Sequence, residues 1–192
     1  MKKYILTGIL AGLSMLFTVS AGAETKAKPK AKKDIPATVV FDGNTYELKY
    51  SKGNQNEWLN EYLLTDTTFN DYHYMFTVRA YDGLIATPQE VGSSVVYNLQ
   101  QSYPGAKYAF FPGLGKDAGL QFFIRNGNIL EFNTFRFTMV NGRPLSLQFV
   151  YREYATPDTE KAVMEKMSRQ LDKKMDVWKE KILTMPVPPI RK

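Results

Sequence analysis

The chain has 192 residues, of which 25 are basic and 19 acidic, and it contains no cysteine. The absence of cysteine excludes disulfide bonds, a cysteine nucleophile and a lipid attached to a cysteine side chain. Its length and its 44% content of hydrophobic residues predict one folded domain with a real core rather than a disordered chain.

Residues 1–23 have the three parts of a secretory signal peptide. Lys2 and Lys3 form a positive start, an apolar run covers residues 5–19, and small residues end at Ala23. This order of charge, apolar run and small cleavage site is typical of an export signal. The alternative is an uncleaved membrane anchor, but the run is shorter than the roughly 20 residues that span a bilayer. We therefore expect an exported protein, periplasmic or secreted after cleavage near Ala23, whose mature chain has no transmembrane segment.

A lysine-rich segment, residues 24–36, carries most of the excess positive charge. Its basic residues are Lys26, Lys28, Lys30, Lys32 and Lys33. Alternation with alanine and proline predicts an extended linker. It is either a solvated spacer or an arm that makes weak contact with an anionic surface or another polyanion. Residues 37–192 hold 18 basic and 17 acidic residues, so we expect no sequence-specific binding of nucleic acid.

The domain, residues 37–192, is expected to begin with a β-hairpin. Asp42 and Gly43 lie between two runs of β-forming residues, and this pair favours a tight turn because the turn needs positive φ angles. Residues 58–64 are ambiguous between a short helical turn and the approach to a strand.

Residues 71–81 alternate with a period of two, which predicts a strand. Tyr72 and Tyr74 belong to one face of this strand, and His73 and Arg79 belong to the other.

The next predicted element is a helix that begins at Thr87-Pro88-Gln89-Glu90. Thr87 and Glu90 have the spacing of a capping box, and proline suits the first helical position. Tyr103-Pro104 ends the helix, because a residue before proline avoids the helical region.

Three strands, residues 120–125, 129–140 and 145–154, follow as a meander with Asn-Gly turns between them. Leu130 and Phe132 in the middle strand match the apolar positions of the first strand, whereas the later apolar positions match those of the third. A regular strand cannot keep both sets on one side. We predict a β-bulge near 133–134; the alternative is a sheet covered on both sides.

A second helix is predicted to start at Thr156-Pro157-Asp158 and to stop at Pro186. Its apolar stripe consists of Met164, Met167, Leu171, Met175, Trp178 and Ile182. We interpret the stripe as core packing against the sheet; the alternative is a docking surface, because methionine adapts to irregular partners.

Strands in runs with two helices set apart predict an α+β fold: an antiparallel sheet packed against a mid-chain helix and a long C-terminal helix. This layout resembles the PsbP/Mog1-type α/β/α sandwich. Trp58 and Glu61-Tyr62-Leu63 before the strand at Asp71, and the stretch 131–136, are also similar to small exported bacterial proteins of uncharacterised function. The resemblance implies a binding or assembly-accessory role, and it transfers no functional residue.

The sequence offers little for catalysis, and it suggests no metal and no cofactor. His73 is the one histidine, and a lone histidine on a strand is more often an ordinary residue than a metal ligand or a base. Residues 113–117 contain Gly-Leu-Gly-Lys-Asp, but the spacing differs from that of a phosphate-binding loop.

Paired carboxylates remain a route to hydrolysis of an envelope glycan. Glu131 and Glu153 lie on strands that should be neighbours, and Arg136 and Arg152 share their expected polar face, so that a solvated lattice of ion pairs is the commoner result.

We expect an exported protein that binds an envelope component or supports envelope assembly, without catalytic activity. The hydrolase and the polyanion-binding arm are the two alternatives. The candidate binding residues are Tyr72, His73, Tyr74, Arg79, Arg136 and Arg152.

Overall fold

The computed structural model describes residues 36–189. The predicted signal peptide and the linker up to residue 35 lie outside the described residues. The strands are β1 (Thr38–Phe41), β2 (Asn44–Gly53), β3 (Glu57–Leu64), β4 (Tyr74–Tyr81), β5 (Lys107–Pro112), β6 (Ala118–Asn126), β7 (Ile129–Val140) and β8 (Arg143–Tyr154), and the helices are α2 (Pro88–Ser102) and α3 (Glu160–Thr184).

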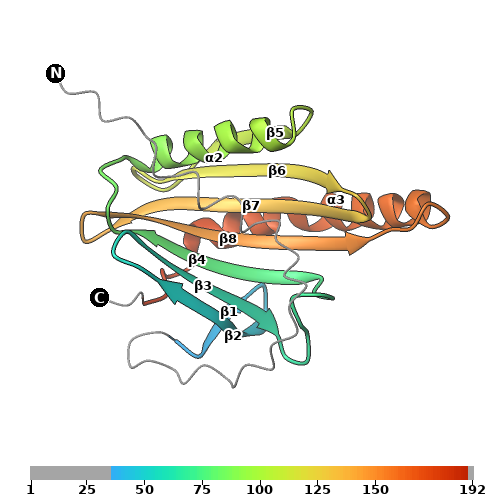
Figure 1. Ribbon diagram of the computed structural model, residues 1–192, viewed down its shortest axis with the longest axis horizontal. Helices are drawn as coiled ribbons and strands as arrows, with labels where there is room; N and C mark the ends of the chain where they lie inside the picture. The colour runs from blue at the N-terminus through green and yellow to red at the C-terminus, as the bar shows by residue number, and fades with distance from the viewer. Residues whose placement is uncertain (1–35, 190–192) are drawn as a thin grey trace.

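All the strands of the described residues form one antiparallel sheet in the order β1-β2-β3-β4-β8-β7-β6-β5. In Figure 1, α3 runs behind β7 and β8, and α2 lies next to β5 and β6. The predicted α+β fold, with a mid-chain and a C-terminal helix on an antiparallel sheet, is therefore confirmed. Within residues 36–189, neither helix is long and apolar enough to cross a membrane.

The N-terminal hairpin forms as predicted, because Asp42 and Gly43 adopt φ angles of 48° and 81°. The ambiguous residues 58–64 belong to β3. The strand predicted from residue 71 begins at Tyr74. Strand β5 was not predicted; it forms an edge of the sheet and is exposed along most of its length.

The start of α2 is the predicted capping box: the backbone N–H of Glu90 donates to Thr87 Oγ1, and the backbone N–H of Thr87 donates to the Glu90 carboxylate at 2.7 Å. The start of α3 comes later than predicted, at Glu160. A turn replaces the first predicted residues of that helix, since the backbone N–H of Thr156 donates to Thr159 Oγ1 at 2.9 Å.

The predicted bulge near 133–134 is wrong, and the alternative, a sheet covered on both sides, is correct. β7 pairs with β6 and with β8 without any shift of register. Leu130 and Phe132 pack in the core beneath α3, whereas Phe135 and Phe137 pack on the opposite face with the apolar residues of α2. The change of apolar parity along β7 thus marks the change from one covering helix to the other.

The core beneath α3 is rich in aromatic residues. Trp178, which is 1% exposed, contacts rings from β4, β7 and β8, including Phe149 with a centroid distance of 4.9 Å. Met167 and Ile182 are buried beside it, but Met164 and Met175 are 41% and 38% exposed. The apolar stripe of α3 is therefore core at three positions of the six and partly exposed at others.

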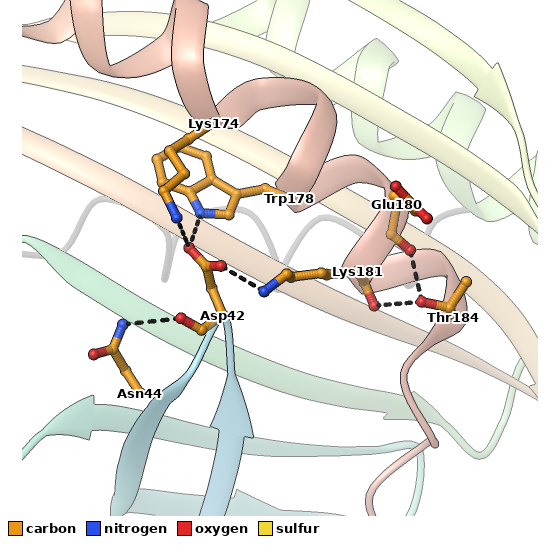
Figure 2. Close-up of polar contacts among 7 residues, drawn as sticks. All are labelled: Asp42, Asn44, Lys174, Trp178, Glu180, Lys181 and Thr184. Atoms are coloured by element: carbon orange, nitrogen blue, oxygen red, sulfur yellow. Dashed lines mark hydrogen bonds and ion pairs between the residues drawn. The ribbon is translucent and has the colours of Figure 1, made fainter.

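Figure 2 shows how the β1–β2 turn is attached to α3. The carboxylate of Asp42 accepts hydrogen bonds from Lys174 Nζ at 2.9 Å, from Trp178 Nε1 at 2.9 Å and from Lys181 Nζ at 2.7 Å. We call these four residues the Asp42 latch. It satisfies the indole N–H of the central core residue and joins two segments that lie more than 130 residues apart in sequence.

Helix α2 packs closely against β6 and β7. A Cβ atom at Gly92 would lie 3.0 Å from the ring of Phe110 and 3.1 Å from the ring of Phe137, so glycine permits this close approach. Of the two described helices, α2 packs mainly on β6 and β7, and α3 packs on β7 and β8. On the α2 side of the sheet, β3 and β4 are therefore not among the strands that α2 mainly covers.

Candidate functional site

Polar side chains occupy the α2 side of the sheet where β3, β4 and β8 lie next to one another. Glu61 on β3 pairs with Thr77 on β4, and Thr77 pairs with Gln148 on β8. Arg79 is two residues further along β4, and so it belongs to the same face. We call Glu61, Thr77, Arg79 and Gln148 the polar row.

The polar row contains a carboxyl group with a displaced pKa. Burial raises the pKa of Glu61 to about 7, and the positive charge of Arg79 partly opposes this rise. The displacement follows from desolvation, which disfavours the ionised form. Glu61 therefore changes its charge close to neutral pH.

Thr77 is 4% exposed, and its Oγ1 atom is buried without a hydrogen-bond partner. Most buried polar groups in native proteins are hydrogen-bonded. An unpaired hydroxyl between Glu61 and Gln148 is therefore a feature that the packing of the sheet does not by itself account for.

A buried ion pair adjoins the polar row on the same face. Arg152 donates from Nε and Nη2 to Glu131 Oε2 at 2.8 and 2.6 Å, and the two residues are 8% and 1% exposed. Asn133 donates to Glu131 Oε1 at 3.0 Å, and Gln148 donates to Asn133 Oδ1 at 2.7 Å. This chain of hydrogen bonds connects the ion pair to the polar row.

The aromatic ring of Tyr72 covers the ion pair. The guanidinium carbon of Arg152 lies 4.1 Å from the centroid of that ring, which is the geometry of a cation–π contact. Burial opposes the charge of Arg152, but the interaction with the Glu131 carboxylate, assisted by the Tyr72 phenol, outweighs it and raises the Arg152 pKa. Tyr72 also packs with Leu63 and Met75, so the loop before β4 closes one end of the polar face.

The other tyrosine and the histidine among the predicted binding residues lie elsewhere. Tyr74 is on the α3 side, stacked against Tyr151 with a centroid distance of 5.3 Å. His73 Nδ1 lies 2.8 Å from the carbonyl oxygen of Arg152 and 3.5 Å from Glu153 Oε2. Both residues hold the start of β4 against β8.

Arg136 is also on the α3 side. Its Nε donates to Asp117 at 2.7 Å, and its Nη1 donates to the carbonyl oxygen of Met185 at 2.8 Å. It thereby ties the turn before β6 to the residues that follow α3. Of the six predicted binding residues, Tyr72, Arg79 and Arg152 lie on the α2 side. Tyr72 contacts Arg152, whereas Arg79 lies further along the sheet, opposite Ser146. Tyr74 and Arg136 lie on the α3 side.

The two glutamates considered for hydrolysis lie on opposite faces of the sheet. Glu131 pairs directly with Arg152 on the α2 side, whereas Glu153 is opposite Leu130 and faces α3. Glu153 accepts hydrogen bonds from the Tyr151 hydroxyl at 2.7 Å and from Lys166 Nζ at 2.9 Å. This pair of carboxylates therefore cannot flank a single glycosidic bond.

Sequence reasoning missed three members of the polar row: Glu61, Thr77 and Gln148. Glu61 was missed because β3 was not recognised as a strand, so its face was undefined. Thr77 and Gln148 are polar residues inside predicted strands, and their pattern alone could not separate an exposed face from a buried one. The signal that could have identified Gln148 was the recurrence of polar residues at alternate positions within residues 145–154.

A comparison with protein families finds a family model that matches residues 33–180. The match covers well over half of the chain, and the chain therefore belongs to that family. No curated protein matches the chain in a sequence search.

Proposed function

We propose that this chain, as a member of the family matched over residues 33–180, is an exported binding protein of the cell envelope that binds its partner through the polar row. The proposal combines the predicted export signal in residues 1–23 with the face of the sheet that carries the polar row. It describes a protein that works by binding or by supporting assembly rather than by catalysis.

The observation that carries the proposal is the composition of the α2 side of β3, β4 and β8. Binding sites combine a few convergent polar groups with apolar surroundings. Here a carboxyl group with a pKa of about 7, a guanidinium group and an unpaired buried hydroxyl lie on two neighbouring strands, β3 and β4. Perturbed pKa values cluster at functional sites, and this agreement supports the choice of face.

Export is tested by sequencing the N-terminus of the protein recovered from the cells that make it. We expect the chain to begin at Glu24 and to appear in the envelope or the medium. A chain that begins at Met1 and stays in the cytosol contradicts the proposal.

The binding face is tested by photo-cross-linking in the same cells. Lys52 is exposed and pairs with Leu59 on the α2 side of the sheet, so a photoreactive residue at position 52 lies beside the polar row. Arg169 on α3, with a side chain that is 66% exposed, provides the matched control. A discrete cross-linked product from position 52 and none from position 169 is the expected result.

A further inference from the structure

We propose that the polar row binds an uncharged ligand with neighbouring hydroxyl groups, which is the chemistry of a saccharide unit. This inference rests on the proposed function, because it names the class of ligand for the same face. Charge balance, hydrogen-bonding capacity and the unpaired hydroxyl each contribute to it.

The charges on the face favour an uncharged ligand. Glu61 lies near Arg79, whose positive charge acts on its carboxyl group, and Glu131 is paired with Arg152. An anion at the row would meet the ionised carboxylate of Glu61, and a cation would meet the guanidinium group of Arg79. A neutral ligand avoids both repulsions, which are strong at half-buried positions where water screens little.

The hydrogen-bonding groups of the row suit adjacent hydroxyls. Ionised Glu61 only accepts, Arg79 only donates, and the hydroxyl of Thr77 can do both. A hydroxyl group also donates and accepts, so two neighbouring hydroxyls can donate to Glu61 and accept from Arg79 at the same time. The Thr77 hydroxyl, which lacks a partner among the protein groups, would gain one.

A ligand would reach Thr77 past the side chains of its neighbours on the same face. Thr77 itself is buried, but Glu61 and Arg79 beside it are half-buried, and both have long side chains that can change rotamer. Tyr81 comes next on the same face of β4, and its hydroxyl lies 3.3 Å from Ser146 Oγ. Its half-buried ring supplies an apolar surface beside the polar groups.

The test titrates the purified full-length chain with four probes: tetrasaccharides of glucose, mannose, galactose and N-acetylglucosamine. Saturation-transfer NMR detects binding, and citrate and spermidine serve as anionic and cationic probes. We expect at least one tetrasaccharide to bind and neither charged probe to compete with it.

Thr77→Val provides the decisive variant because it keeps the shape of the side chain and removes only the hydroxyl. We expect about a tenfold loss of tetrasaccharide affinity, the factor that one ordinary hydrogen bond produces. Thr134→Val is the matched control, since Thr134 also carries a buried hydroxyl without a partner but lies on the α3 side. It should bind as the unaltered chain does, and neither variant should melt at a lower temperature.

Three results would overturn the inference: no tetrasaccharide binds, the two valine variants bind equally, or a charged probe displaces the tetrasaccharide. If no tetrasaccharide binds while position 52 still forms its cross-linked product in cells, the ligand class is wrong and the proposed binding face stands. If both experiments fail, the proposed function fails with the inference.

Discussion

Replacing Asp42 with alanine tests whether the Asp42 latch holds α3 against the N-terminal hairpin. The Asp42 side chain is 10% exposed, and its carboxylate accepts three hydrogen bonds from α3 (Figure 2). Removing it leaves the buried indole N–H of Trp178 without its acceptor. The variant should therefore lose stability through identifiable contacts.

The expected loss has three parts. An unpaired buried N–H costs about 1–3 kcal/mol. The two lysine pairs, with lysine side chains that are 38% and 45% exposed, add about 0–1 kcal/mol. Alanine at a residue with φ of 48° adds about 1–2 kcal/mol, because a left-handed conformation strains a residue with a Cβ atom. Asp42→Ala should therefore lower the free energy of unfolding by about 2–6 kcal/mol.

Asp42→Asn separates the charge from the backbone strain. Asparagine tolerates the left-handed conformation, and its carbonyl can still accept from Trp178, so we expect a loss of about 1 kcal/mol. Urea denaturation followed by tryptophan fluorescence measures both variants. Asp176→Asn is the control, because Asp176 is 83% exposed and should change stability by less than about 0.5 kcal/mol. A loss for Asp42→Ala that is no larger than that of the control would refute the latch.

The same latch predicts a pH dependence. Burial alone would raise the pKa of Asp42, but the hydrogen bonds from Lys181, Lys174 and Trp178 outweigh it, so the pKa lies below 3.8 in the folded protein. The carboxylate therefore stabilises the fold fully above the unfolded value of 3.8, and this contribution disappears as the pH falls through the lower folded value. The stability difference between the unaltered chain and Asp42→Asn should shrink below pH 4.

Three further predictions concern the sheet and its polar face. Glu131→Gln leaves a buried guanidinium group without its negatively charged partner and should cost about 3–5 kcal/mol in urea denaturation; Glu160→Gln, in an exposed ion pair, should cost less than about 1 kcal/mol. Gly119→Ala would place a Cβ atom 2.0 Å from an aromatic ring of β5 and should lower stability by about 1–3 kcal/mol, whereas Gly105→Ala meets nothing within 4 Å and should be nearly neutral. The folded-state pKa of Glu61 is raised from 4.5 to about 7, so the unfolded chain gives up this proton first and stability falls as pH rises between these values. Glu61→Gln should therefore be more stable relative to the unaltered chain at pH 8 than at pH 4.5, and an equal difference at both pH values would contradict the raised pKa.

Turns and helix caps that depend on neighbouring residues could be predicted from the sequence. The turn at Asp42-Gly43 and the capping box at Thr87 depend on a few neighbouring residues with particular φ angles and side-chain oxygens, and both formed as predicted. The start of α3 was misplaced because Thr156 can bond within a turn as well as cap a helix.

Features that depend on contacts between segments far apart in the sequence could not be predicted. The pattern of β7 could not reveal that two helices cover opposite faces, and assuming one core face produced a bulge that does not exist. Arg136 and Arg152 were assigned to one face for the same reason, although the sheet separates them. The polar row needs three strands in register, and a single sequence does not give that register.

We propose above all that the protein contacts its partner through the polar row. The sharpest measurement places the photoreactive residue at position 52 and combines it with Glu61→Gln and Arg79→Ala in the same chain, in the cells that make the protein. We predict that the cross-linked product disappears while the altered chain keeps its normal level and melts no lower than the unaltered chain. A product that forms at full yield with both changes present would contradict the claim.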